Sequence, residues 1–166
     1  ILTRVIEILN YIGKELPVET RQRLEQLRDT FIGNDFSSKM KRYVGMDIVE
    51  DNYDEEGNQV NQIQLQIEAL AQQAVVNNNL LKSELDWLVT AEAQNGYRFG
   101  YELGRKDNGL SLLPILLEAQ RNANLDPSVN FLSGYFRIIF EKDLVRWENT
   151  LDTMKEDIKL NTWIPE

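Results

Sequence analysis

Residues 96–121, GYRFGYELGRKDNGLSLLPILLEAQR, align without a gap with residues 130–155, NFLSGYFRIIFEKDLVRWENTLDTMK, at an offset of 34 positions. Each copy holds a helix-length segment, a polar break and a second helix-length segment. In this alignment Gly100 and Tyr101 match Gly134 and Tyr135. A fixed offset of this size is typical of stacked helical hairpins, which bury one face only by packing on their neighbours. The pattern therefore predicts an all-α fold of stacked antiparallel helix pairs.

Apolar residues spaced three and four apart predict helices along the rest of the chain as well. Gly33 reads as a helix stop and Asp35 as the cap of the next helix, while Asp126-Pro127 reads as a capped helix start. Strand-like alternation is missing, so about eight or nine helices are expected. Helices are predicted over 2–16, over Pro17–Phe31, from Asp35 through Ile48, from Val60 to Asn77, over 81–88, and within the repeat units 90–123 and 126–158.

The segments Leu112–Ala119 and Phe131–Phe136 carry a family resemblance. Through them the chain resembles the HEAT-like helical-repeat proteins of bacteria over residues 84–158, which implies an α-solenoid fragment with a protein-interaction or scaffolding surface. No functional residue is carried over from this resemblance. Residues 1–80 show no third copy and are expected to form a divergent helical part, continuous in one domain with the HEAT-like pair at 81–166. Because Ile1 opens directly on a helical pattern, we expect a segment of a larger protein.

Composition excludes several kinds of chemistry. The chain has 166 residues but no Cys and no His, which removes disulfides, thiol nucleophiles, His-based triads and zinc sites built on these ligands. The net charge is −9, and residues 46–80 hold seven acids and no base. Binding to nucleic acid requires clustered positive charge. Only residues 1–45, with eight bases against six acids, could provide a basic patch. A nucleic-acid-binding repeat is therefore the least favoured function.

A stripe of glycines and aromatics is the candidate functional feature. Gly96, Gly100 and Gly104 fall four apart and share one face of the predicted helix, which suggests close packing against a neighbouring repeat helix or a shallow groove for a partner. Tyr97 and Tyr101 form a second stripe that would suit either repeat core or an interface. Arg98, Glu102 and Arg105 are expected to lie together on the solvent side. The predicted partner surface is Tyr97, Arg98, Gly100, Tyr101, Gly104 and Arg105.

The acidic stretch 50–59 is expected to be a mobile surface loop, with a possible hairpin tip at Gly57-Asn58. Residues 52–57 partly match a calcium loop, but Ile63 stands where a bidentate Glu is needed, so a solvated loop is preferred. No catalytic, cofactor or metal residue is predicted. We expect a cytoplasmic, non-enzymatic protein-interaction or scaffolding segment that binds a protein partner or other domains of its own chain. The alternative is a regulatory or sensor arm attached to an enzyme module.

Overall fold

A computed structural model describes residues 2–46, 52–53, 59–60 and 62–164 of the chain. This described part contains ten α-helices, one short antiparallel hairpin and a 3-10 turn, so the prediction of an all-α protein is confirmed there. The helices are α1 (Leu2–Ile12), α2 (Val18–Ile32), α3 (Phe36–Tyr43), α4 (Gln62–Val76), α5 (Asn78–Lys82), α6 (Leu85–Leu88), α7 (Gly96–Lys106), α8 (Leu113–Arg121), α9 (Asn130–Lys142) and α10 (Leu144–Glu156), followed by the 3-10 turn η1 (Asn161–Trp163).

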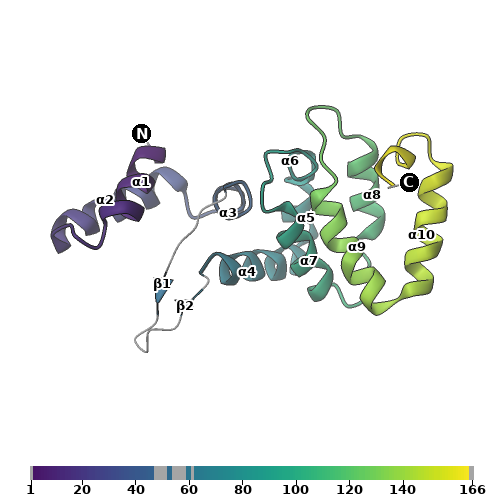
Figure 1. Ribbon diagram of the computed structural model, residues 1–166, viewed down its shortest axis with the longest axis horizontal. Helices are drawn as coiled ribbons and strands as arrows, with labels where there is room; N and C mark the ends of the chain where they lie inside the picture. Colours follow the sequence, from purple (N-terminus) through teal and green to yellow (C-terminus); the bar gives the residue numbers. More distant parts are fainter. Residues whose placement is uncertain (1, 47–51, 54–58, 61, 165–166) are drawn as a thin grey trace.

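The helices line up in a row in which sequence neighbours are not always spatial neighbours (Figure 1). α3 packs on α4, α4 on α7, α7 on α9, and α9 on α10, while α8 contacts α6 and α9. The α1–α2 pair lies at the opposite end of the row from α10, apart from the helices that hold the core. Large side chains at the centre, including Phe99, Phe131 and Tyr135, are almost fully buried. Among the described residues, none of the helices combines the length and the apolar character that crossing a membrane requires.

The stop and cap signals before α3 behave as predicted. Gly33 ends α2 with φ of 71°, a left-handed conformation that favours glycine. The Asp35 side chain then accepts a hydrogen bond from the backbone N–H of Ser38 at 3.0 Å, which caps α3. Two other boundaries differ, because α1 ends at Ile12 rather than at residue 16, and Pro17 precedes α2 rather than opening it.

The segment around residue 60 differs more from its prediction. Val60 does not begin a helix, because it pairs with Asn52 in an antiparallel hairpin of β1 (Asn52–Tyr53) and β2 (Gln59–Val60). The helix predicted over 81–88 is divided into α5 and α6, and α5 has its own cap in the side chain of Asn77. The predicted hairpin tip, the rest of the acidic loop and Ile48 lie outside the described residues.

The prediction that Asp126-Pro127 starts a helix is wrong. Asp126 has φ of 41°, and α9 begins only at Asn130. Instead, the backbone carbonyl of Asp126 accepts a hydrogen bond from Ala91 N–H at 3.0 Å, and Ser128 N–H donates to the carbonyl of Val89 at 2.8 Å. These bonds join the loop before α9 to the loop before α7. The long-range partners therefore override the local capping signal.

Among the described helices, the most extensive contact is that of the parallel pair α7 and α9. At one end Gly96 lies against Phe131, and at the other Gly104 lies against Ile138. Lys142, at the end of α9, donates through Nζ to the carbonyl of Gly104 at 2.9 Å. Both helices thus run in the same direction, and they begin 34 residues apart, at Gly96 and Asn130.

Candidate functional site

The predicted partner surface divides into a buried part and an exposed part. Gly100 and Gly104 are buried, and a Cβ atom on either would collide with α9, so the packing interpretation of the glycine stripe is correct and these two positions are not available to a partner. Arg98 is exposed, Tyr97 is 46% exposed, and Tyr101 is half-buried beside them. Whether these exposed residues contact a partner stays a prediction.

Glu102 is placed differently from its prediction on the solvent side. Its side chain is buried between α4 and α7, where Gln64 of α4 donates to its carboxylate at 3.0 Å. Arg105 closes over it from the surface, with its guanidinium 3.1 Å from the same oxygen. The hydrogen bond and the charge of Glu102 raise the pKa of Arg105. Because its guanidinium is paired with Glu102 of the same helix, Arg105 is held against α7 rather than projecting freely toward a partner.

A hollow lies beside this surface, between α9 and α10. It is an open groove of about 550 Å³, within the range of small-molecule sites. α9 provides one wall with Leu132, Phe136 and Phe140, and α10 provides the other wall with Trp147 and Leu151. Phe140 and Trp147 meet edge to face across the groove, with ring centroids 5.3 Å apart.

Polar side chains also line the groove. Ser133 and Arg137 lie one helical turn apart on α9, and Tyr97 reaches the groove from α7. Arg137 donates through Nε to Glu141 at 2.7 Å, and this hydrogen bond raises the pKa of Arg137. Its guanidinium carbon also lies 5.6 Å from the centre of the Phe140 ring. The three polar residues all carry hydrogen-bond donors, and Arg137 adds a positive charge.

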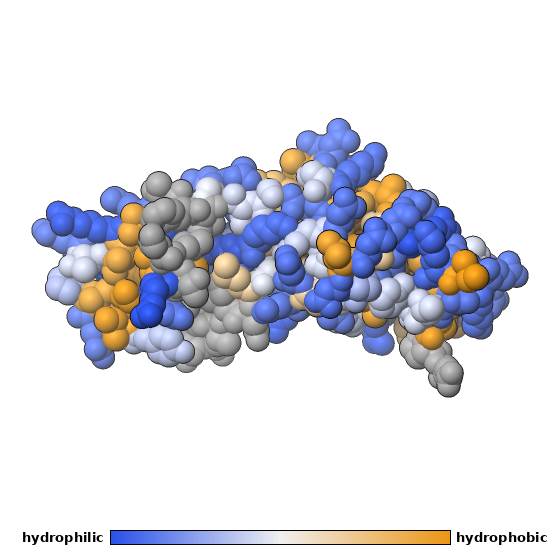
Figure 2. All heavy atoms as spheres, turned by 90° about the horizontal axis from the view of Figure 1, so that it is seen from above, coloured by the Kyte–Doolittle hydropathy of each residue, from blue (hydrophilic) through white to orange (hydrophobic). Residues whose placement is uncertain are grey.

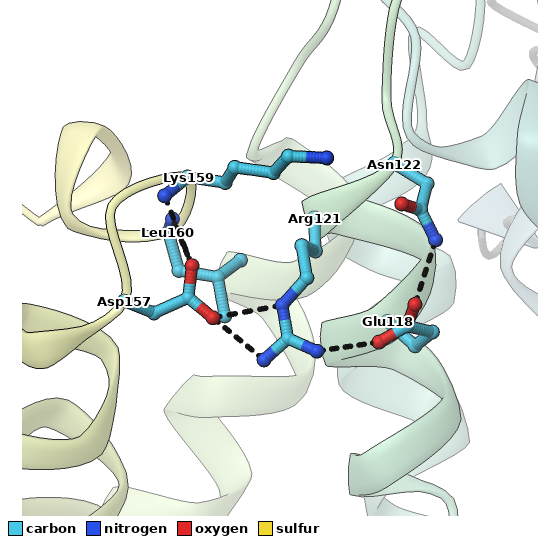
Figure 3. Close-up of polar contacts among 6 residues, drawn as sticks. All are labelled: Glu118, Arg121, Asn122, Asp157, Lys159 and Leu160. Atoms are coloured by element: carbon cyan, nitrogen blue, oxygen red, sulfur yellow. Dashed lines mark hydrogen bonds and ion pairs between the residues drawn. The ribbon is translucent and has the colours of Figure 1, made fainter.

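The end of the groove is formed by Trp163 and Ile164, in and after η1. This segment is fastened to α8 by Arg121, whose guanidinium donates to Asp157 through Nε at 2.7 Å and bonds Glu118 through Nη1 at 2.6 Å (Figure 3). Asp157 also accepts hydrogen bonds from the backbone N–H groups of Lys159 and Leu160. The bond from Lys159 is the main cause of the lowered pKa of Asp157; Arg121 adds to it, and partial burial opposes it. The segment that leads to Trp163 is therefore bonded to α8 through Asp157.

Deeper in the molecule, Asp107 joins the end of α7 to the start of α8 and to α9. Its Oδ2 accepts hydrogen bonds from the Tyr135 hydroxyl at 2.7 Å and from Leu112 N–H at 2.8 Å. Burial alone would raise the pKa of Asp107, but these bonds and those from Ser111 outweigh it and lower the pKa. Burial, followed by the bond to Asp107, raises the pKa of Tyr135 far above its ordinary value. This pair is covered by protein and holds the helices rather than facing a ligand.

A smaller hollow of about 310 Å³ lies between α3 and α6. Lys41 lies over the ring of Trp87, with Nζ 3.5 Å from the ring centre, and it also approaches the Glu84 carboxylate at 3.7 Å. Burial lowers the pKa of Lys41, although Glu84 and Glu92 oppose this shift. The cation that such an aromatic face would attract is supplied by the protein itself.

The α1–α2 hairpin presents the most exposed apolar surface. Among the described side chains of these two helices, only Val5 is buried. Tyr11 is 84% exposed and Val18 is 58% exposed. Figure 2 shows apolar atoms gathered on the surface at this end of the molecule. The exposed large apolar side chains of the hairpin are Ile8, Tyr11, Ile12, Val18 and Leu27.

Comparison with known proteins adds no further constraint. No protein-family model, no curated protein and no solved structure matches this chain.

The groove and the exposed hairpin were not found by sequence reasoning. Leu132 and Phe136 stood out in the sequence only as part of the segment Phe131–Phe136 that carries the family resemblance, and nothing local marks Trp163 as their neighbour. The one available signal was the i, i+4 spacing of Ser133 and Arg137 on the face that also carries Phe136 and Phe140.

Proposed function

We propose that this chain is a non-enzymatic protein-interaction or scaffolding segment that docks a protein partner on the α1–α2 hairpin. The observation that carries the proposal is the exposure of Tyr11, Ile12 and Val18 on a helix pair that buries only Val5 among its described side chains. Exposed apolar patches on soluble domains are typical of interaction sites. An amphipathic helix such as α1 gains most of its stability from the surface that covers its apolar face.

The other helices would provide the scaffold. We propose that α7–α8 and α9–α10 are two units of a HEAT-like stack, as the family resemblance implies. Their 34-residue offset is matched in the ion pairs of the second helices, since Glu118–Arg121 in α8 corresponds to Asp152–Lys155 in α10. The parallel packing of α7 on α9 also supports this proposal, because the first helices of successive units lie side by side in such stacks.

Site-specific photo-crosslinking tests the docking proposal. A photoreactive benzoylphenylalanine is introduced at Tyr11 or Val18 of the full-length protein, in the cells that produce it. Val76 is the control position, because it is 77% exposed but lies at the end of α4. We expect a discrete, heavier crosslinked species from Tyr11 and Val18 but none from Val76. A second change, Ile12→Glu, should abolish that species because it introduces a charge into the apolar patch. Absence of any crosslink at both hairpin positions would overturn the proposal.

A second candidate function, a regulatory or sensor arm, is favoured by the groove between α9 and α10. Its apolar walls and donor groups suit a small ligand better than the flat surface of a globular partner. Binding there would act on the Trp163 segment, which Arg121 holds in place.

A further inference from the structure

The groove between α9 and α10 combines an apolar interior with donors of hydrogen bonds. The walls from Leu132, Phe136 and Trp147 would bury an aromatic or aliphatic body. Tyr97, Ser133 and Arg137 offer two hydroxyls and one guanidinium. A ligand that matches this arrangement has an apolar body and an acceptor group at one end.

The charge of the groove defines that acceptor further. No Asp or Glu is among the described residues that line it, although the chain holds 27 acids against 18 bases. Arg137 is therefore the only charged group in this described lining. An acceptor with a single negative charge therefore complements this lining better than a cation does.

Arg137 can accept such a ligand without breaking a strong interaction. Its bond to Glu141 uses Nε, and both side chains of this pair are substantially exposed, at 53% and 37%. Exposed ion pairs of this kind contribute little to stability. Neither Nη atom of Arg137 has a hydrogen bond to the part of the chain that the structure describes. The edge of the guanidinium that these two Nη atoms form can therefore bind both oxygens of a carboxylate.

From this geometry we propose that the groove binds a small organic acid, with its aromatic or aliphatic body between Phe136 and Trp147 and its carboxylate on Tyr97, Ser133 and Arg137. The inference deepens the sensor candidate and does not depend on the α1–α2 hairpin. Trp163 and Ile164 form the end wall, so the bound acid lies against the segment that Asp157 anchors. Binding to this groove can be tested apart from the hairpin, through the charge of Arg137 and the signals of Trp147 and Trp163.

The binding test uses two dyes that share an aromatic body and differ in charge. The anion 1-anilinonaphthalene-8-sulfonate and the uncharged N-phenyl-1-naphthylamine are titrated separately into the full chain. We expect the anion to bind more tightly, and Arg137→Gln to weaken its binding about three- to tenfold, in line with the loss of a charged hydrogen-bond partner at a partly exposed site. Arg98→Gln is the matched control, because Arg98 is exposed on α7 but does not line the groove. Both variants should keep the parent's thermal midpoint.

A competition experiment then tests the carboxylate itself. Octanoate should displace the anionic dye, whereas octylammonium, which has a chain of the same length and the opposite charge, should not. The location of binding is read from the indole N–H signals in nuclear magnetic resonance spectra, assigned with single Trp→Phe variants. The signals of Trp147 and Trp163 should shift with octanoate, and that of Trp87, which lies beside α3, should stay in place.

Three results would overturn the inference. One is equal binding of the charged and uncharged dyes, which would mean that the groove is an apolar docking face without charge selection. Another is unchanged affinity in Arg137→Gln. The third is a shift of Trp87 as large as that of Trp147. None of these results affects crosslinking at Tyr11, so the two proposals can fail separately.

Discussion

Gly100 and Gly134 pack reciprocally across the parallel pair of α7 and α9. A Cβ atom on Gly100 would collide with the backbone carbonyl of Phe131, and a Cβ atom on Gly134 would collide with that of Tyr97. Tyr97 and Phe131 are themselves equivalent positions of the two copies, 34 residues apart. The same close approach therefore occurs twice, and backbone atoms rather than flexible side chains define it on both sides.

Replacement of either glycine by alanine should destabilise the protein. Alanine is the better helix former by about 1 kcal/mol, yet the collision at Gly100 or Gly134 should outweigh this and lower the free energy of unfolding by about 1–3 kcal/mol. Urea denaturation measures the change. Gly109→Ala is the matched control, because a Cβ atom there meets nothing within 4 Å. If Gly100→Ala and Gly109→Ala had equal midpoints, the close packing of α7 on α9 would be refuted.

Gln120 should be replaceable with a gain in stability. It is only 1% exposed, and neither Nε2 nor Oε1 has a hydrogen-bond partner among the described residues. Gln120→Met keeps the length of the side chain and removes the unpaired amide, so we expect about 1 kcal/mol more stability. Gln120→Ala should instead lower stability, because it leaves a cavity. Thermal melting compares the three proteins, and a lower midpoint for Gln120→Met would show that the amide is hydrogen-bonded in solution.

The Asp107–Tyr135 pair should make stability depend on pH at the acid end. Because the folded pKa of Asp107 is lowered, its ionised form contributes stability above the unfolded pKa of about 4, and this is lost as the pH falls through the folded pKa. Asp107→Asn should be less stable at pH 7 and should lose less between about pH 4 and 2. Urea midpoints over this range measure the difference. Parallel pH curves for the two proteins would contradict the assignment.

The Asp107–Tyr135 pair should also make stability depend on pH at the alkaline end. There the stability should fall as the pH rises, whereas at the acid end it falls as the pH drops. The pKa of Tyr135 is raised in the folded state, so its stabilising contribution is present below the unfolded pKa of about 10 and declines as the pH rises toward the folded value. Tyr135→Phe should cost about 1–2 kcal/mol at pH 7, since Asp107 stays buried with one donor fewer. It should also flatten the decline above pH 10, relative to the parent protein. An unchanged alkaline slope would assign that slope to another group.

Loss of Arg121 should loosen the end of the groove without unfolding the core. In Arg121→Gln the Asp157 carboxylate loses its ionic partner, so the amide hydrogens of Lys159 and Leu160 should exchange faster with solvent. Hydrogen exchange followed by mass spectrometry measures this, with α7 as an internal reference. Lys155→Gln is the control, because it removes only an exposed pair with Asp152. Equal exchange in the two variants would mean that Arg121 does not anchor the segment.

Local patterns predict the helices well and their environments less well. Periodicity placed α7 through α10, and the glycine spacing predicted the close approach of another helix at Gly100. Glu102 was placed on the wrong side because charged residues are usually exposed, and its partner Gln64 lies 38 positions away in the sequence. The helix start predicted at Asp126 was wrong because of partners distant in the sequence as well, since its loop is hydrogen-bonded to residues 89–91.

The groove required three-dimensional information of another kind. Its walls come from α9 and α10, its donors from α7 and α9, and its end from the turn after α10. A periodic sequence identifies Phe136 and Leu151 as apolar but does not state that a hollow is left between them. Packing of whole helices decides where space remains, and no single segment encodes that outcome.

The parallel orientation of α7 and α9 has an electrostatic consequence. Two helices that run side by side in the same direction place their macrodipoles in the least favourable relative arrangement, with both negative ends together. Lys142 lies at this end and donates from its ammonium group to the carbonyls of Gly104 and Arg105, which belong to the last turn of the neighbouring helix. The ammonium group of Lys142 thus stabilises the negative C-terminal ends of both α7 and α9. At the opposite end the amide groups of both helices, near Gly96 and Asn130, give this edge of the bundle a partial positive charge within an otherwise acidic protein.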